Sequence, residues 1–168
     1  YSSADSVEAG VGSVRPQPDL GEPKSFAAEN VPTGDIQSFL RKQIALAKEG
    51  YWSETGMTDK TKSNKNILSI WKDIGLEKVA GGTDQTAWCM AFVVWTLKQN
   101  GYRYAQTARA ADITERTKAF NCTKVTSDPQ PGDICHWKYG AGNHVNFIYE
   151  ILPGGKFTLV GGNQTEKN

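Results

Sequence analysis

The feature that most constrains the fold is the apolar segment at residues 83–102, TDQTAWCMAFVVWTLKQNGY. It has the length of a helix and is apolar around its whole circumference, which is typical of a helix buried on every side. It ends in Asn100-Gly101, a stop signal, because glycine accepts the left-handed conformation that closes a helix without steric cost. The sequence therefore predicts one buried helix around which the other elements pack.

The start of this helix is expected among Thr83, Asp84 and Thr86, whose side chains can accept hydrogen bonds from first-turn amides. Cys89 then lies in or near the first turn, where the amides and the helix dipole lower the pKa of a thiol and favour the nucleophilic thiolate. A free cysteine is also among the most buried residue types, so the helix by itself favours a core role.

The chain has 168 residues and is 38% hydrophobic, which is enough for one domain with a core and an extension. Its 19 basic and 18 acidic residues are scattered, which argues against nucleic acid as a partner. No apolar run reaches the roughly 18 residues of a membrane span, so we expect none.

The three cysteines, Cys89, Cys122 and Cys135, leave at least one thiol free unless it pairs between chains. A disulfide between Cys122 and Cys135 would leave Cys89 as the free thiol. The candidate metal ligands are scattered without a CxxC or HxxxH spacing, so we expect no metal site and no organic cofactor.

Residues 1–33 are rich in Ser, Gly, Pro, Ala and Glu and show no period, so they are expected to be a linker or a segment laid on the surface. Amphipathic helices are predicted from Asp35 to Gly50 and over residues 65–75, and a weaker one over residues 105–120. Two strands joined by Pro-Gly-Gly follow at residues 144–162. Helices before a hairpin indicate an α+β domain, here residues 34–168.

The hairpin places an amide side chain beside His144 in either of two registers. If Pro153 lies opposite Lys156, His144 is a diagonal neighbour of Asn163, and if Leu152 pairs with Lys156, His144 faces Gln164. A catalytic imidazole needs its second nitrogen held in this way, whereas His136 has no comparable partner in the sequence.

Several motifs together resemble those of one enzyme superfamily. "WC" opens the apolar helix, and it is followed in order by "PGDI", "NHVNFI" and "FTLVGGNQ". This order and spacing, over about residues 36–166, resembles the NlpC-type and CHAP cysteine peptidases. The resemblance implies a papain-like α+β fold in which N-terminal helices pack on a small antiparallel sheet.

The resemblance also implies roles for particular residues. Cys89 takes the position of the nucleophile, His144 that of the base and Asn163 that of the orienting residue, with Gln164 as the alternative third residue. Gln85 is expected to supply an oxyanion donor beside the Cys89 amide. In several CHAP members an acidic residue stands where this chain has Gly161. Asp133 of "PGDI" resembles a structural aspartate.

The implied function is hydrolysis of an amide bond in peptidoglycan or a muropeptide by a thiol mechanism, in a secreted lysin or antibacterial effector that acts in the periplasm or cell wall. An inhibitor or immunity protein is a further expected partner. Two alternatives keep the fold: a protease, deamidase or acyltransferase toxin that acts on a protein, and an inactive cell-wall binding module. Of the five tryptophans, most are expected in the core, and Trp88 or Trp137 is the one expected to line a groove.

Overall fold

A computed structural model of the chain describes residues 2–4, 10–19, 35–56 and 60–164. The helices are α1 (Ile36–Lys48), α2 (Lys65–Asp73), α3 (Glu77–Ala80), α4 (Cys89–Gln99) and α5 (Asp112–Glu115), with short 3-10 turns η1 (Lys60–Lys62) and η2 (Thr117–Phe120). The strands are β1 (Ser2–Ala4), β2 (Gly10–Pro16), β3 (Cys122–Val125), β4 (Ile134–Tyr139), β5 (Gly142–Leu152) and β6 (Lys156–Val160).

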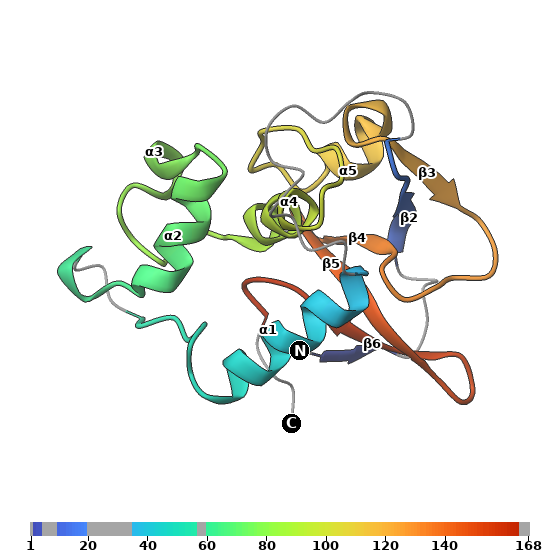
Figure 1. The fold of residues 1–168 in the computed structure, drawn as a ribbon, viewed down its shortest axis with the longest axis horizontal. Helices are drawn as coiled ribbons and strands as arrows, with labels where there is room; N and C mark the ends of the chain where they lie inside the picture. The colour runs from blue at the N-terminus through green and yellow to red at the C-terminus, as the bar shows by residue number, and fades with distance from the viewer. Residues whose placement is uncertain (1, 5–9, 20–34, 57–59, 165–168) are drawn as a thin grey trace.

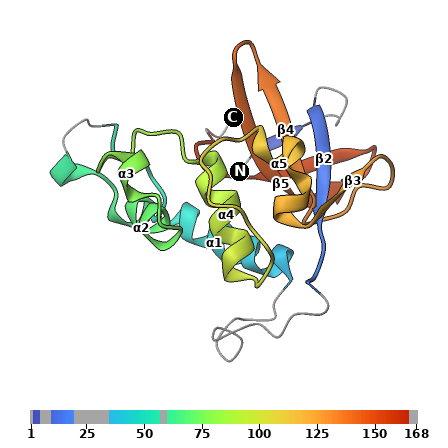
Figure 2. The ribbon, with the colours of Figure 1, turned by 90° about the horizontal axis from the view of Figure 1, so that it is seen from above.

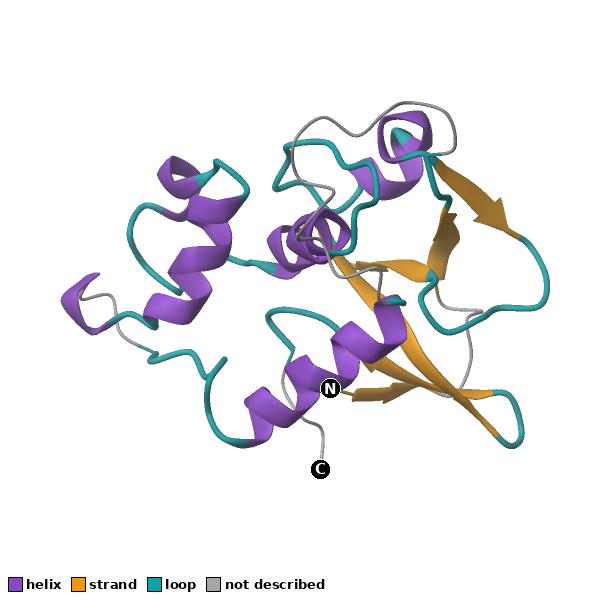
Figure 3. Cartoon of the chain, in the orientation of Figure 1, coloured by secondary structure: helices purple, strands orange, loops and turns teal. Residues whose placement is uncertain are grey.

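The strands form one antiparallel sheet in the order β1-β6-β5-β4-β2-β3. Helices α1 and α4 pack on β5, whereas α5 packs on β2 and β4. Helices α2 and α3 lie on the far side of α4 from the sheet (Figures 1 and 2). The helical and sheet portions are largely segregated (Figure 3), so the predicted α+β class is confirmed.

The first two predicted helices are confirmed, and each has an N-cap side chain. Asp35 accepts a hydrogen bond from the Ser38 amide at 2.7 Å at the start of α1. At the start of α2, Asn64 accepts from the amides of Asn66 and Ile67. Each cap satisfies first-turn N–H groups that have no partner within the helix.

The apolar helix α4 is buried on nearly all sides, as its composition predicts, but its start differs from the prediction. Its N-cap residue is Trp88, which makes no side-chain capping bond, and Cys89 is the first helical residue. Asp84 is fully buried and accepts instead from the backbone amides of Thr55 and Asn64. The expected capping carboxylate therefore anchors the segment before α2.

The single helix predicted over residues 105–120 is wrong, because only α5 and η2, which cover half of these residues, are helical. Before α5, the hydroxyl of Thr107 accepts from the Arg109 amide and donates to Asp112. Such local side-chain bonds offer the backbone an alternative to the helical ladder. The Ala, Thr and Arg composition does not reveal this competition.

Residues 2–4 and 10–16 form strands β1 and β2, so the expectation of a linker or surface segment is wrong for them. The same expectation stays untested for residues 1, 5–9 and 20–33, which lie outside the described residues. Strand β2 lies inside the sheet between β4 and β3, and Val14 is fully buried. Strand β2 contains two glycines and only a short alternation of apolar and polar residues, so its sequence gives little indication of a strand. Its pairing with two neighbours stabilises it, which residue composition cannot show.

The sheet carries apolar side chains on both faces. One set joins the helices in the main core, and it comprises Val14, Ile134, Val145, Phe147 and Val160. A second cluster on the opposite face comprises Cys135, Trp137, Ile148, Phe157 and Leu159. Within the described ranges, no helix combines the length and hydrophobicity that a bilayer span requires.

The Cys122–Cys135 bridge considered from the sequence is absent, and all three cysteines are free. Cys122 pairs with Pro16, while Cys135 pairs with Ser13 on the other side of the same strand. Two strands on either side of a third are about 9–10 Å apart, beyond the Cα separation that a disulfide spans.

Arg15 fastens β2 to the turn before β4. Its guanidinium donates to both carboxylate oxygens of Asp133, at 2.7 and 3.1 Å, and Asp133 also accepts from the Gln130 amide. Asp133 is only 1% exposed. This agrees with the structural role that the sequence suggests for it.

We predict that Arg15→Met lowers the free energy of unfolding by about 1–3 kcal/mol, because it leaves a buried carboxylate without its cation. Urea denaturation would measure the change. Arg103→Met is the matched control, since it removes an exposed ion pair with Asp19 and should change stability by less than about 1 kcal/mol. Equal effects of the two variants would contradict the role assigned to Arg15.

Candidate active site

Cys89 lies at the N-terminus of α4, where this helix meets β5. Its side chain is only 5% exposed. The backbone N–H groups of Val145, Met90 and Cys89 itself act to lower the pKa of the Cys89 thiol and so favour its thiolate. Val145 directly follows His144, so the expected nucleophile and the expected base come from adjoining parts of the site.

The electrostatic balance at Cys89 differs from the sequence expectation. Burial raises the pKa of the Cys89 thiol, and the three N–H groups offset only part of that shift. Burial also lowers the pKa of His144, and the bond to Gln164 opposes this shift only in part. Both shifts favour the neutral thiol and the neutral imidazole over a thiolate and an imidazolium.

His144 stands near the start of β5, and its partner is Gln164. Its Nε2 lies 3.3 Å from Oε1 of Gln164, and the same oxygen accepts from Nδ2 of Asn146 at 3.0 Å. The imidazole is therefore held by an amide oxygen that is itself anchored. Among the described residues, no hydrogen bond joins the ring directly to Cys89 in this resting arrangement.

The turn that follows β6 brings Gln164 to the ring. Leu152 pairs with Lys156 at the turn, and a register shift follows between Ile148 and Glu150. The pairing of β6 ends with Val160 opposite Phe147, and the chain then turns through Gly162 and Asn163.

The turn after β6 gives different surroundings to Asn163 and Gln164, the two candidates for the residue that orients His144. Asn163 is exposed and has a left-handed backbone with φ of 57°, and within the described ranges it makes no hydrogen bond to His144. A side chain at position 161 would begin 2.6 Å from Oε1 of Gln164. Gln164 thus fills the space in which an acidic residue at position 161 would extend.

Gln85, the expected oxyanion donor, is exposed, and its Nε2 donates to Oδ1 of Asp84 at 2.6 Å. Asp84 also accepts from Thr55 and Asn64. Burial alone would raise the pKa of Asp84, but the hydrogen bonds from Asn64, Gln85 and Thr55 together outweigh it and lower the pKa. A stable carboxylate therefore fixes one end of the Gln85 amide.

A groove of about 690 Å³ is lined in part by Trp88, Asn163 and Gln164, but not by Cys89 or His144. Its apolar part includes Trp52, Trp88 and Phe92, and the residues after β6 that line it are Gly161, Asn163 and Gln164. The indole N–H of Trp88 donates to Glu54 at 2.8 Å, which orients the ring. Trp88 thus lines a groove, as one of the two candidates from the sequence, whereas Trp137 is buried in the second cluster.

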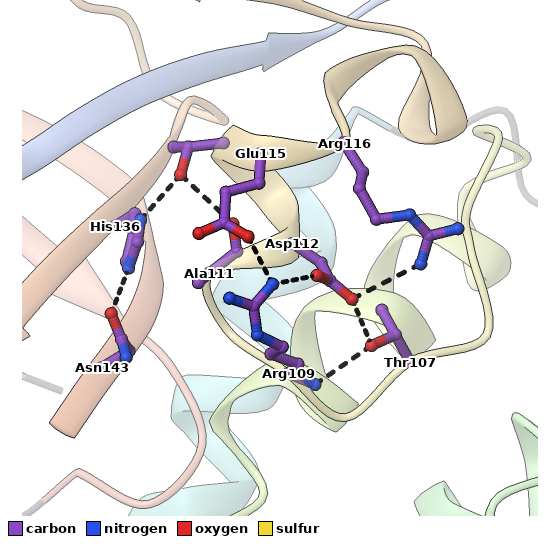
Figure 4. Close-up of polar contacts among 9 residues, drawn as sticks. Thr107, Arg109, Ala111, Asp112, Glu115, Arg116, His136 and Asn143 are labelled. Carbon is purple, nitrogen blue, oxygen red and sulfur yellow. Dashed lines mark hydrogen bonds and ion pairs between the residues drawn. The ribbon is translucent and has the colours of Figure 1, made fainter.

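His136 belongs to a different cluster and is only 3% exposed. Its Nδ1 lies 2.8 Å from the hydroxyl of Thr114, and its Nε2 lies 2.8 Å from Oδ1 of Asn143. Figure 4 shows these contacts beside the ion pairs that Arg109 makes with Asp112 and Glu115. Both ring nitrogens of His136 are thus occupied, whereas the sequence suggested no partner for it.

Three contributors to the site were not identified from the sequence. Asn146 and Trp137 support Gln164, and the N–H of Val145 faces the sulfur. Alternation along β5 places Asn146 on the same side of the strand as His144, which is a signal that could have identified it. The described residues contain no group of three or more His, Cys, Asp or Glu side chains that could hold a metal ion.

We predict that alkylation of Cys89 by iodoacetamide is slow at neutral pH and accelerates only above the usual thiol range near pH 8.5, because a raised pKa delays thiolate formation. Peptide mapping would separate Cys89 from Cys122 and Cys135, whose pKa values burial raises to about 12 and about 11. A rate that is already maximal below pH 6 would instead indicate a preformed ion pair.

One comparison with known proteins agrees with the motifs in the sequence. The family model described as CHAP domain matches residues 81–163, which include Cys89 and His144. No curated protein matches the chain, and no solved structure matches it. The matched residues extend from the loop before α4 to the turn after β6. Residues 81–163 are therefore similar to a CHAP domain, in agreement with the motifs in the sequence.

Proposed function

We propose that the protein hydrolyses an amide bond of peptidoglycan, with Cys89 as nucleophile, His144 as base and Gln164 as the residue that orients His144. The observation that carries this proposal is the junction of α4 and β5, where the backbone N–H of Val145 acts on the buried sulfur of Cys89 and the imidazole of the preceding residue, His144, is held by an amide oxygen. A nucleophile, a base and an orienting group are the parts that thiol catalysis requires.

The CHAP domain indicates a hydrolase of the amidase or peptidase type, and such domains often act on peptidoglycan. The bond that is cut, within the stem peptide or cross-link or between sugar and peptide, belongs to the proposal. The groove beside the site supports a substrate of this kind, because it combines indole faces with the polar groups of Gln43 and Glu54. Aromatic faces suit the apolar surfaces of sugars and short peptides.

In the proposed mechanism, His144 removes the thiol proton while Sγ of Cys89 attacks the carbonyl carbon. The C–N bond then breaks, and the imidazolium gives its proton to the leaving amine, which leaves a thioester on Cys89. Water loses a proton to His144 and adds to the thioester. The C–S bond breaks and the proton returns to sulfur. These steps draw on no metal or organic cofactor.

The neutral resting pair defines the role of His144. Because the thiol pKa is raised and the imidazole pKa is lowered, proton transfer accompanies the attack rather than preceding it. The backbone N–H of Cys89 is suited to hold the oxyanion, with Gln85 as the second donor. Asp84 restrains the Gln85 amide, so less ordering would be required when substrate binds.

A peptidoglycan substrate implies action in the periplasm or the cell wall, reached by secretion or delivery. A lysin or antibacterial effector fits this location. An inhibitor or immunity protein that covers the groove is a further expected partner of such an enzyme.

We predict that Cys89→Ala abolishes release of peptide fragments from purified sacculi while the fold is retained, and that His144→Ala lowers release at least 100-fold. Mass spectrometry of the soluble muropeptides would measure release and identify the bond. Circular dichroism would show that each variant is folded. Undiminished release by Cys89→Ala would exclude Cys89 as the nucleophile. Cleavage only in a panel of host proteins would favour a toxin with a protein substrate.

The two amides after β6 allow a matched comparison. We predict that Gln164→Ala lowers kcat about 10- to 100-fold, because His144 loses its partner, whereas Asn163→Ala changes kcat less than about 3-fold. Steady-state hydrolysis of a defined muropeptide would measure both. A larger loss for Asn163→Ala would return the orienting role to Asn163.

The burial of Cys89 and its raised pKa favour one second candidate, an inactive module that binds cell wall through the same groove. This candidate predicts that sacculi retain the wild-type protein without releasing fragments. It also predicts that Cys89→Ala binds sacculi as the wild type does. Co-sedimentation with sacculi, followed by analysis of the supernatant, separates the two functions.

A further inference from the structure

A chain of hydrogen bonds leads from the second apolar cluster to His144. The indole Nε1 of Trp137 lies 2.8 Å from Oδ1 of Asn146, and this contact is buried. Nδ2 of Asn146 lies 3.0 Å from Oε1 of Gln164, which in turn lies 3.3 Å from Nε2 of His144. Trp137 and Asn146 touch neither the sulfur nor the groove, so the proposed mechanism gives them no part.

The first member of this chain fixes the direction of every other bond. An indole N–H only donates, so the Asn146 atom that faces it must be the carbonyl oxygen. The amide NH₂ of Asn146 then faces Gln164, so the Gln164 atom at that point must be the oxygen. An oxygen that faces Nε2 of His144 requires that Nε2 carry the proton.

We propose that Trp137 and Asn146 are positioning residues that, through Gln164, hold His144 as the tautomer protonated on Nε2. This inference rests on the proposed function, since it supplies the unprotonated Nδ1 that accepts the thiol proton. In the opposite tautomer Nδ1 would carry a hydrogen and could not act as a base. Selection of the tautomer by the partner of the second nitrogen is how orienting residues act in such sites.

The burial of Trp137 and Asn146 helps the chain of hydrogen bonds to keep one donor-to-acceptor direction. Asn146 is 3% exposed and Trp137 is 5% exposed, so water competes little for either side chain. A reversed Asn146 would place its NH₂ against the indole N–H and leave two buried donors facing each other, which is costly. The chain therefore has one favoured direction.

The test uses two variants of the full chain and a readout of the tautomer. Asn146→Asp keeps the shape but replaces the NH₂ by an acceptor, so Gln164 must turn its own NH₂ toward the new carboxylate. That NH₂ then faces Nε2 of His144, and the proton moves to Nδ1. Trp137→Phe removes the fixed donor without adding a charge, so Asn146 is free to adopt both directions.

Long-range proton–nitrogen correlation spectra of the nitrogen-15-labelled protein at neutral pH report the tautomer of each of the two histidines. We expect the wild type to show His144 with its proton on Nε2, Asn146→Asp to show it on Nδ1, and Trp137→Phe to show a mixture. For hydrolysis of a defined muropeptide, we expect kcat to fall roughly 10- to 1,000-fold in Asn146→Asp and less in Trp137→Phe, with KM nearly unchanged.

Asn143→Asp is the matched control, because it makes the same change on the same strand beside the other histidine. Its Oδ1 lies 2.8 Å from Nε2 of His136. The signals of His136 should respond, while the tautomer of His144 and kcat should stay as in the wild type. Thermal unfolding would confirm that each variant is folded, and Trp137→Phe decides the matter should Asn146→Asp fail to fold.

A wild-type spectrum with the proton on Nδ1 of His144 would overturn the inference, as would an unchanged tautomer in both variants. The spectrum is independent of turnover. Failure of the proposed function would appear instead as a wild-type protein that releases no fragments, or as release that survives Cys89→Ala. The two failures are therefore distinguishable.

Discussion

The candidate site depends on the burial of the N-terminus of α4 against β5 at the point where β6 stops pairing. An all-apolar helix must be enclosed, so its first turn is carried into the interior with Cys89 at its start. Because β6 ends opposite Phe147, the preceding part of β5 is left to meet the helix. The sulfur consequently faces the N–H of Val145, and His144 is one residue away.

This burial has an electrostatic consequence that shapes the chemistry. The first-turn amides act in the direction expected of a helix N-terminus, but desolvation of the thiolate is the larger effect at Cys89. The same desolvation favours neutral His144. A site that rests as two neutral groups needs its imidazole in one tautomer, since a thiol proton can pass only to an unprotonated nitrogen. The anchoring of Gln164 is therefore as relevant to the mechanism as the position of the sulfur.

Much of this could be predicted from the sequence, since periodicity and caps indicate α1, α2 and the end of α4, and the Pro-Gly-Gly turn indicates the β5–β6 hairpin. Contacts between distant segments could not be predicted. Strand β2 lies between β4 and β3, and Asp84 accepts hydrogen bonds from the amides of residues 55 and 64 instead of capping α4. The hairpin indicated that an amide lies near His144. The choice between Asn163 and Gln164 depends on a register shift and a turn that no local pattern encodes.

The central claim is that Cys89 forms the covalent bond to the acyl group of the substrate. Its most direct test is the intact mass of the protein quenched during turnover of a defined muropeptide, followed by peptide mapping. The account predicts an added mass equal to the acyl fragment, located on Cys89 and released by hydroxylamine as a thioester is. Turnover with no adduct on Cys89, or with an adduct on Cys122 or Cys135, would contradict it.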